Sequence, residues 1–398
     1  MLLETKIEDL LDAYPDTAIC FGKAAMTQLA VYLNAENTRK IALLTGGSSA
    51  KKSGALMAFV DVLKQGGDIG IISFRDIEPE PSVDTVRRMT EFLYREQPDQ
   101  VVAIGGGSPL DAAKAAWLIH QAGGVIDDYF GVNRFSSANP GRKLKKIIAI
   151  PTTSGTGSEA TPYSNIVDRE QQVKKLISER EIIPEYSFVV PEFAVTMPPS
   201  VTLATGCDAL AHAIEGFLNI GADNAHPQAN TWAFEAIRLI VGNLPTAVQD
   251  GQNMKARTAM SAAATLAGMV ICYKPTGLPH LCSFSWFGRI EHGLAVALIL
   301  PAAWRYYIGS EAVARRTMEL APVFGGSTPE EVIAGYRAFL DRCGVPGGLR
   351  HYSDIDQALL DRTAESAGQN KMKLDSAPRP VALEDSRNIL SGILKEAW

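Results

Sequence analysis

Cysteine is scarce in this sequence, and its copies are never paired. The five cysteines are scattered through 398 residues, and none stands in a CxxC motif. An odd number without paired spacing argues against a disulfide framework. We therefore expect a reduced protein of the cytoplasm.

Long hydrophobic runs, a basic leader and an excess of positive charge are also absent. The longest apolar run, residues 294–304, is too short to span a bilayer and contains a proline. The N-terminal stretch is acidic and lacks the basic-then-apolar order of a signal peptide. The formal net charge is −6, so we expect neither nucleic acid nor a membrane surface as a partner.

The composition that is present is that of a globular protein. Hydrophobic residues make up 46% of the chain and charged residues 21%, which argues against disorder and allows two domains. Strand-like runs at 40–47, 68–74, 101–107 and 145–153 alternate with helical stretches. Most of these runs are continuously apolar, as in parallel strands covered on both faces. The pattern predicts a doubly wound, mostly parallel α/β sheet.

A pair of prolines divides the chain. The stretch TMPPS at 196–200 ends the alternation, and the sequence after it shows helical periodicity and almost no strand signal. We predict an α/β dinucleotide-binding domain over 1–197 and an all-helical domain for metal and substrate over 198–398.

Two glycine-rich loops follow predicted strands of the first domain. Residues 101–115 contain a strand, the stretch GGGS and a helix, and PTTSGTGSEAT follows the next strand at 151–161. Glycines let the backbone approach a phosphate, and a helix N-terminus offers free N–H groups and the positive end of its dipole. Either loop alone could be an ordinary turn. Two of them after neighbouring strands predict a dinucleotide site.

A third glycine stretch, TGGSSAKKSG at 45–54, bears on the choice between NADP and NAD. Dinucleotide folds that bind NAD hold the ribose hydroxyl with an acidic residue near the end of an early strand. Here glycine and serine stand at that position, and Lys51 and Lys52 follow. No carboxylate would repel a 2′-phosphate, so we expect NADP, with NAD as the second choice. Alternatively, the stretch is a solvated basic turn.

Three polar side chains lie on one side of an otherwise apolar predicted helix. Asp208, His212 and Glu215 in GCDALAHAIEGF are spaced i, i+4 and i+7. Burying them costs several kcal/mol unless each finds a partner, which could be a salt bridge or a metal ion. His280 and His292 lie in other apolar segments, and together with Asp208 and His212 they would suit Fe²⁺ or Zn²⁺. We expect Glu215 to support a ligand or form a salt bridge rather than bind the metal.

Four motifs in this order, GGGSPLDAAKA, PTTSGTGSEAT, GCDALAHAIEGF and EHGLAVALILP, resemble the iron-containing (group III) alcohol dehydrogenase family. The similarity extends along almost the whole chain, from residue 19 to the final LKEAW. It implies the architecture shared with dehydroquinate synthase, and hydride transfer between an alcohol and C4 of a nicotinamide at a divalent metal. The expected activity is that of an NAD(P)-dependent alcohol dehydrogenase or aldehyde reductase. Family members are commonly dimers or larger, so we also expect a homo-oligomer.

The resemblance further implies which residues bind the metal and the cofactor. The implied metal ligands are Asp208, His212, His280 and His292, and no side chain is assigned as a catalytic acid or base. The residues matched to cofactor contacts are Gly47, Ser49, Gly105, Gly106, Gly107, Ser108, Asp111, Thr152, Thr153 and Lys175.

The sequence departs from the family pattern between His280 and His292. This segment is shortened, and Phe284 stands where many members carry another histidine near the nicotinamide. The residues expected to line an altered substrate pocket are Cys282, Phe284, Trp286 and Arg289. Lys274 and Arg289 flank the segment, and we expect both to face solvent. If either pointed inward, an anionic substrate would be indicated.

Two alternative functions remain open at this point. One is an NAD- and metal-dependent lyase or cyclase of the dehydroquinate synthase type, which would recycle its cofactor within one turnover. The other is a relative that binds metal and nucleotide but has lost catalysis through the altered segment. Net turnover of NADP(H) separates the alcohol dehydrogenase from both.

Overall fold

The computed structural model describes residues 6–66 and 69–398. Residues 1–5, with which the predicted first domain begins, and residue 68, the first of a predicted strand, lie outside the described residues. The chain divides into two compact units. The first contains the residues up to Pro198 together with Gly251–Gly268, and the second contains Pro199–Asp250 and Met269–Trp398. The first unit therefore includes a segment that the sequence analysis placed in the helical domain.

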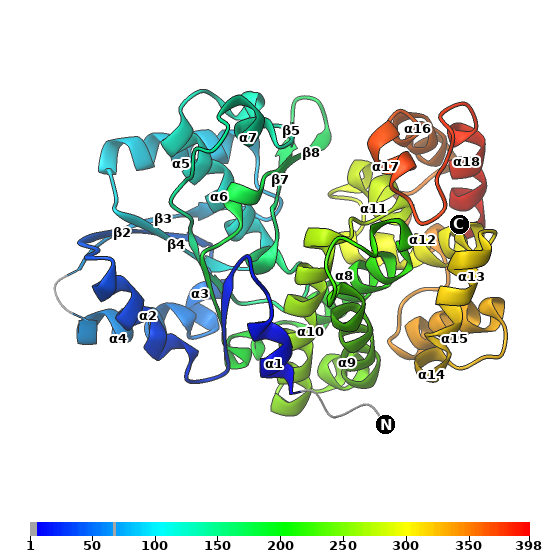
Figure 1. Cartoon of the computed structure of the whole chain (residues 1–398), viewed down its shortest axis with the longest axis horizontal. Helices are drawn as coiled ribbons and strands as arrows, with labels where there is room; N and C mark the ends of the chain where they lie inside the picture. Colours follow the sequence, from blue (N-terminus) through cyan, green and yellow to red (C-terminus); the bar gives the residue numbers. More distant parts are fainter. Residues whose placement is uncertain (1–5, 67–68) are drawn as a thin grey trace. The chain divides into compact units, whose positions relative to one another are not determined.

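The first unit is built on a six-stranded sheet in which all neighbouring strands run parallel (Figure 1). The strand order is β1-β9-β6-β4-β2-β3. The bounds are Ala18–Phe21 for β1, Lys40–Gly46 for β2, Gly70–Ile77 for β3, Gln100–Gly105 for β4, Ile148–Pro151 for β6 and Tyr186–Val189 for β9. The predicted strands are present as β2, β3, β4 and β6, and the mostly parallel sheet is confirmed.

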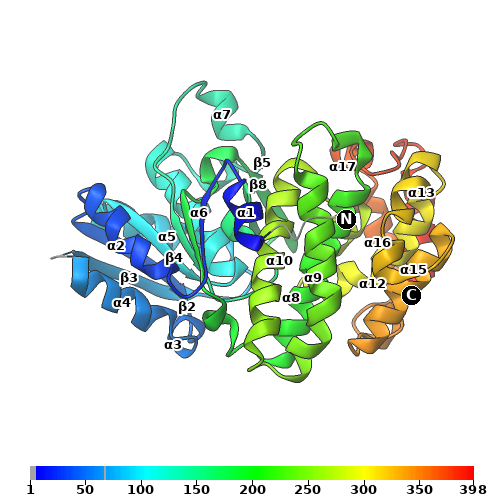
Figure 2. The ribbon, with the colours of Figure 1, turned by 60° about the horizontal axis from the view of Figure 1, so that its bottom comes forward.

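Helices cover both faces of this sheet, so the predicted doubly wound arrangement is also confirmed (Figure 2). Ala42 and Leu44 of β2 pack in one core with α5 and α6, whereas Ile41 and Leu43 pack in the other with α2 and α4. Alternate side chains of a strand point to opposite faces, so a strand buried on both faces is continuously apolar. The helices of this unit include α1 (Ile7–Asp12), α2 (Ala25–Ala35), α3 (Ser49–Lys52), α4 (Ala55–Gly66), α5 (Val83–Glu96), α6 (Gly107–Ala122) and α7 (Arg134–Ala138).

The first unit also contains a three-stranded sheet that the sequence analysis missed. Its order is β5-β8-β7, with β5 at Gly131–Val132, β8 at Val173–Ser178 and β7 at Tyr163–Asp168. β7 and β8 pair antiparallel, and this places Lys175 opposite Ile166. These strands mix polar and apolar residues and are only partly buried, so no continuous apolar run marks them.

The second unit contains helices and no strand in residues 199–250 and 269–398, in agreement with the sequence pattern. The long helix α8 packs against α9 and α12. The bounds are Pro199–Leu218 for α8, Ala229–Gln249 for α9, Leu278–Ser283 for α11, His292–Tyr307 for α12, Glu311–Met318 for α13, Ala321–Phe324 for α14, Pro329–Arg342 for α15, Gln357–Ala367 for α16, Lys371–Asp375 for α17 and Ser386–Ala397 for α18. Helix α10 (Met254–Tyr273) begins in the first unit and ends in the second.

Membrane-spanning helices are not found among the described helices, because none is both long and apolar enough to cross a bilayer.

The contact between α8 and α12 depends on a glycine. A Cβ atom on Gly293 would lie 1.9 Å from the carbonyl oxygen of Ala204 and 2.8 Å from the Cβ of Asp208. A larger residue would therefore push the start of α12 away from α8. Glycine in the EHG motif lets the preceding residue, His292, lie close to Asp208.

Candidate metal centre and nucleotide-binding loops

The residues predicted to bind a metal meet in the second unit. Asp208 and His212 lie one turn apart on α8, His280 lies on the short helix α11, and His292 is the first residue of α12. The first three are at most 6% exposed, and 28% of the His292 side chain is accessible. One carboxylate and three imidazoles from three helices thus converge inside an apolar helical layer.

The donor atoms of Asp208, His212 and His280 all lie within 4.8 Å of one another, and His292 approaches this group through Asp208. Asp208 Oδ1 lies 3.7 Å from Nε2 of His212, 3.5 Å from Nε2 of His280 and 3.7 Å from Nε2 of His292. A four-coordinate ion with bonds of about 2.1 Å holds its ligand atoms about 3.4 Å apart. The donor set, which is carboxylate and imidazole, suits Fe²⁺ or Zn²⁺. The residues present therefore fit a divalent metal.

Protein partners do not satisfy these donors. Asp208 Oδ1 and His280 Nε2 are buried and have no hydrogen bond from the described part of the chain. Burial raises the pKa of Asp208, but the imidazoles around it outweigh that effect and hold the pKa well below its usual range. The carboxylate is therefore ionised, and in the metal-free protein the protonated His280 is its positive partner. A bound divalent cation would take the place of that proton.

Glu215 orients His280 and does not join the donor group. Its Oε2 contacts Nδ1 of His280, so the ring donates its Nδ1–H to the carboxylate and turns its Nε2 towards Asp208. Burial lowers the pKa of His280, but Glu215 and Asp208 outweigh it and raise the pKa to about 9. The supporting role predicted for Glu215 agrees with this contact.

The imidazole rings of His292 and His212 have different surroundings from that of His280. Ser283 Oγ donates to the carbonyl of His280 at 2.8 Å and lies 3.1 Å from Nδ1 of His292, which leaves Nε2 of that ring to accept a cation. His212 stacks on His280 with ring centroids 4.6 Å apart, and burial lowers its pKa to about 4. His212 is thus neutral at physiological pH, as a metal ligand must be. Ser283 was not anticipated, since a serine in an apolar segment gives no signal of this role.

The altered segment after His280 places the aromatic ring of Phe284 beside the candidate metal ligand His292. Phe284 packs beside His292 with ring centroids 6.3 Å apart and an angle of 20° between the planes. Trp286 is buried and donates from Nε1 to Thr363 Oγ1 at 2.8 Å. Cys282 is buried too, and burial raises the pKa of its thiol to about 12, so it stays protonated. Whether this segment lines a substrate pocket stays a prediction.

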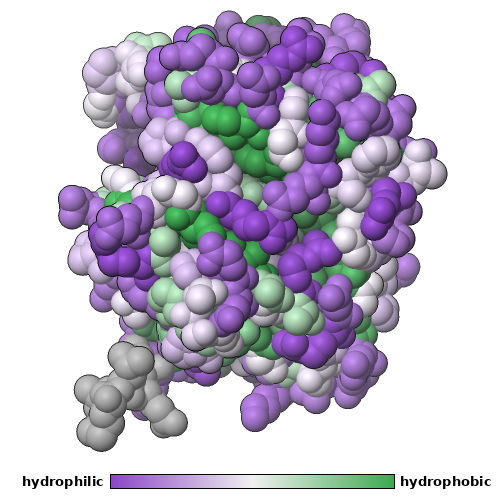
Figure 3. Space-filling view, turned by 90° about the vertical axis from the view of Figure 1, so that its right-hand side faces the viewer, coloured by the Kyte–Doolittle hydropathy of each residue, from purple (hydrophilic) through white to green (hydrophobic). Residues whose placement is uncertain are grey.

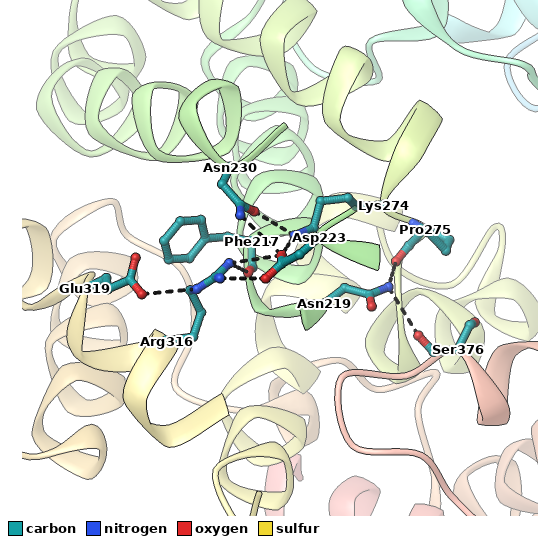
Figure 4. Close-up of polar contacts among 9 residues, drawn as sticks. All are labelled: Phe217, Asn219, Asp223, Asn230, Lys274, Pro275, Arg316, Glu319 and Ser376. Carbon is teal, nitrogen blue, oxygen red and sulfur yellow. Dashed lines mark hydrogen bonds and ion pairs between the residues drawn. The ribbon is translucent and has the colours of Figure 1, made fainter. Parts of the chain in front are cut away.

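Lys274 does not face solvent, so that expectation was wrong. The lysine is fully buried, and its Nζ lies 2.5 Å from Asp223 Oδ1 and 2.6 Å from Asn230 Oδ1 (Figure 4). Arg316 binds the other carboxylate oxygen of Asp223 at 2.7 Å. The charge of Lys274 is neutralised within the unit and therefore does not indicate an anionic substrate. Arg289 is exposed, as expected.

The two glycine-rich loops lie side by side in the first unit. They follow β4 and β6, which are neighbours in the sheet. The backbone N–H of Thr152 donates to the carbonyl of Gly105 at 2.8 Å. A Cβ atom on Gly106 would lie 3.0 Å from Thr153 Cγ2, so glycine is needed for the contact between the loops as well as for any phosphate. Both loops therefore lie at the edge of the sheet where these two parallel strands end.

Helix α6 begins directly after the first loop, at Gly107. The first N–H groups of a helix have no partner within it, and together with the helix dipole they attract an anion. Ser108 Oγ accepts a hydrogen bond from the N–H of Glu80 at 3.0 Å. A loop of small residues that ends in a helix N-terminus suits a diphosphate.

Asp111 lies one turn into α6 and holds the second loop. Its carboxylate accepts hydrogen bonds from Ser158 Oγ at 2.5 Å and from the N–H of Asn165 at 2.9 Å. Burial raises its pKa, while Lys114 and these hydrogen bonds act in the opposite direction. The contacts seen for Asp111 are to the protein, and its contact with a cofactor stays a prediction.

The remaining predicted cofactor residues lie on other elements of the first unit. Gly47 directly follows β2, a parallel neighbour of β4, and Ser49 is the first residue of α3. Both residues are exposed, as are Lys51 and Lys52 of that helix. Lys175 on β8 pairs with acidic neighbours, 2.8 Å from Asp168 and 3.7 Å from Asp127.

Fold and site together define a class of protein. A doubly wound sheet with two adjoining phosphate-type loops indicates a dinucleotide. The helical unit adds a buried carboxylate and two buried imidazoles whose donor atoms lie within 4.8 Å of one another, with His292 Nε2 3.7 Å from the same carboxylate. These features are those of a metal-dependent oxidoreductase that uses a nicotinamide cofactor.

Comparison with known proteins gives the family. Residues 16–191 match the model for iron-containing alcohol dehydrogenase, and residues 202–394 match the C-terminal domain of the Fe-containing alcohol dehydrogenase family. The chain therefore belongs to the iron-containing alcohol dehydrogenase family. It is an NAD(P)-dependent alcohol dehydrogenase that uses iron, and the lyase alternative is not favoured.

Individual relatives cover nearly the same length. The chain is 33% identical to the NADPH-dependent butanol dehydrogenase of Clostridium saccharobutylicum over 86% of this chain and 87% of the relative. It is 28% identical to the NAD-dependent methanol dehydrogenase of Bacillus methanolicus over 95% of this chain and 98% of the relative. The crystal structure of an iron-containing alcohol dehydrogenase from Thermotoga maritima is 30% identical, with a TM-score of 0.80 over 96% of this chain and 99% of that one.

Proposed function

We propose that the enzyme interconverts a small alcohol and its aldehyde or ketone, with Asp208, His212, His280 and His292 holding one divalent metal. The observation that carries this assignment is the unsatisfied Asp208 carboxylate, which has three imidazole Nε2 atoms within 3.7 Å. Fe²⁺ is the favoured ion and Zn²⁺ the second choice.

The residues of the proposed metal centre suit hydride transfer between an alcohol and a nicotinamide. A divalent ion supplies Lewis acidity that stabilises negative charge on the substrate oxygen, and the nicotinamide exchanges a hydride with the substrate carbon. Glu215 and Ser283 keep two imidazoles in the tautomer that presents Nε2. Phe284 packs beside His292 and offers no proton, so we assign no side chain as a catalytic acid or base.

The cofactor site is proposed at the loops of the first unit. Gly105, Gly106, Gly107 and Ser108 would hold the diphosphate at the start of α6, and Asp111 would hold the second loop beside them through Ser158. The other proposed contacts are Gly47, Ser49, Thr152, Thr153 and Lys175.

NADP is proposed as the preferred cofactor. The exposed Gly47 and Ser49 carry no carboxylate to repel a 2′-phosphate, and two exposed lysines follow on α3. The relatives include both an NADPH-dependent and an NAD-dependent enzyme, so their names do not decide the preference.

Cytoplasmic location and a homodimer or larger homo-oligomer are also part of the proposal. The free cysteines support the first. On the face of the molecule shown in Figure 3, apolar side chains gather in patches separated by polar ones. The other partner is a small alcohol or aldehyde, and we propose neither nucleic acid nor a membrane.

Oxidation of NADPH and NADH tests this proposal. The protein is purified anaerobically, loaded with Fe²⁺ or Zn²⁺ and assayed with small, aromatic and carboxylated aldehydes. We expect metal-dependent turnover that prefers NADPH. His280→Ala should lose more than the roughly 10–100-fold in metal affinity that is typical of a supporting residue. Metal and nucleotide binding without turnover of any carbonyl would support a relative that has lost catalysis.

A further inference from the structure

One buried cation in the second unit has no acidic partner among the described residues. Lys373 on α17 is 7% exposed, and its Nζ donates to the carbonyl of Thr276 at 2.9 Å and to Thr276 Oγ1 at 3.0 Å. The described part of the chain thus provides two acceptors for three N–H groups and no ion pair. Lys274, in contrast, is neutralised by Asp223 at 2.5 Å.

The fold ties Lys373 to the metal centre. Thr276 precedes His280 by four residues, and α17 packs against α11. Asn219, one turn after Glu215, donates to the carbonyls of Pro275 at 3.1 Å and Ser376 at 3.2 Å (Figure 4). The end of α8, the segment before α11 and the end of α17 are therefore joined.

The charges that face Lys373 belong to this centre. Glu215 attracts its ammonium group, and Lys373 in turn disfavours protonation of His212. Burial lowers the pKa of Lys373 to about 8, so it is mostly protonated at neutral pH, and Glu215 acts in the opposite direction to burial.

The sum of these charges is positive once a metal is bound. The carboxylates of Asp208 and Glu215 balance a divalent ion, and the protonated Lys373 then remains as an excess positive charge in a buried setting. Uncompensated charge in the interior is unfavourable, and an anion of small size relieves it.

We propose that Lys373 is a positioning residue whose charge makes the metal centre favour a small oxyanion, either a carboxylate or the deprotonated alcohol substrate. This inference rests on the metal ligands proposed above. In this role Lys373 acts through its charge on the metal centre. In a purely structural role it would only hold Thr276 in place through its hydrogen bonds.

Metal affinity of the full-length apoprotein separates the two roles. Lys373→Met removes a charge that repels the cation, so Zn²⁺ affinity at pH 7, measured by competition with a chromophoric chelator, should rise about three- to tenfold. A structural role predicts a fall or no change. Lys371→Met is the matched control, because that lysine on the same helix is 69% exposed and pairs with Asp375. It should leave the affinity unchanged.

Anion binding gives a second measurement with a defined probe. Acetate is titrated into the Co²⁺-loaded protein, and its binding is followed in the visible spectrum. Acetate affinity should fall about three- to tenfold in Lys373→Met and recover in Lys373→Arg. If the methionine variant does not fold, Lys373→Gln is used, since its amide can still donate to Thr276. Equal acetate affinity in wild type and a folded neutral variant would overturn the inference. Failure of the wild type to bind Zn²⁺ would instead overturn the proposed function.

Discussion

Buried charge in the first unit is handled differently from buried charge at the candidate metal centre of the second unit. In the first unit, Lys114 donates to the carbonyls of Thr161 at 2.9 Å and Tyr163 at 3.0 Å, and Glu159 accepts from Thr265 at 2.8 Å. In the second unit, Asp208 Oδ1 and the facing His280 Nε2 have no hydrogen bond among the described residues. Charges of the first kind support the fold, whereas charges of the second kind require a ligand.

The largest expected effect is a loss of stability when the hydrogen-bonded buried charge of Lys114 is removed. Lys114→Met leaves several buried acceptors and Asp111 without their cation, so the free energy of unfolding should fall by about 3–5 kcal/mol. Urea denaturation of the apoprotein measures this. The control is Lys64→Met, whose side chain is 71% exposed and which should change stability by less than about 0.5 kcal/mol. If Lys114→Met lost as little stability as the control, the buried charge of Lys114 would not be supporting the fold.

Removing the residue that orients His280 should act on metal binding. Glu215→Gln weakens the hold on the His280 tautomer, so we expect metal affinity to drop about 10–100-fold. Glu159→Gln is the matched change in the first unit, because Glu159 is equally buried but contacts Thr265. Chelator competition on both variants gives the result. Similar losses in both would mean that the effect is general destabilisation.

The pH dependence of metal affinity tests the role of His280 and Glu215 through a smaller effect. The pKa of His280 is raised to about 9 in the metal-free protein, so below that pH a metal must displace its proton. Apparent metal affinity should therefore rise about tenfold per pH unit towards pH 9 and level off above it. In Glu215→Gln the carboxylate that raises this pKa is gone, so the levelling should begin at lower pH. An affinity that does not vary between pH 6 and pH 8 would contradict the assignment.

Metal-free stability has the opposite dependence on the same group. The raised pKa of His280 means that its protonated form stabilises the metal-free fold below its unfolded pKa. That contribution is lost as the pH rises through about 9. Metal binding and metal-free folding are therefore favoured at opposite ends of this range.

Local sequence patterns indicated much of the fold and the donor types. Continuous apolar runs marked β2, β3, β4 and β6, because strands buried on both faces need apolar side chains throughout. The hairpin of β7 and β8 was missed, because its strands are half-buried and mixed in character. Lys274 was misjudged, because its partner Asp223 lies far along the chain from it.

Helical periodicity in the sequence was enough to place Asp208 and His212 on one face of a single helix. The motifs also carried His280 and His292 as candidates. The folded structure was needed to show that the donor atoms of Asp208, His212 and His280 lie within 4.8 Å of one another and that Glu215 and Ser283 contact two of the imidazole rings. The reason is physical: hydrogen-bond partners and electric fields depend on distance in space, and the packing of α8, α11, α12 and α17 sets those distances.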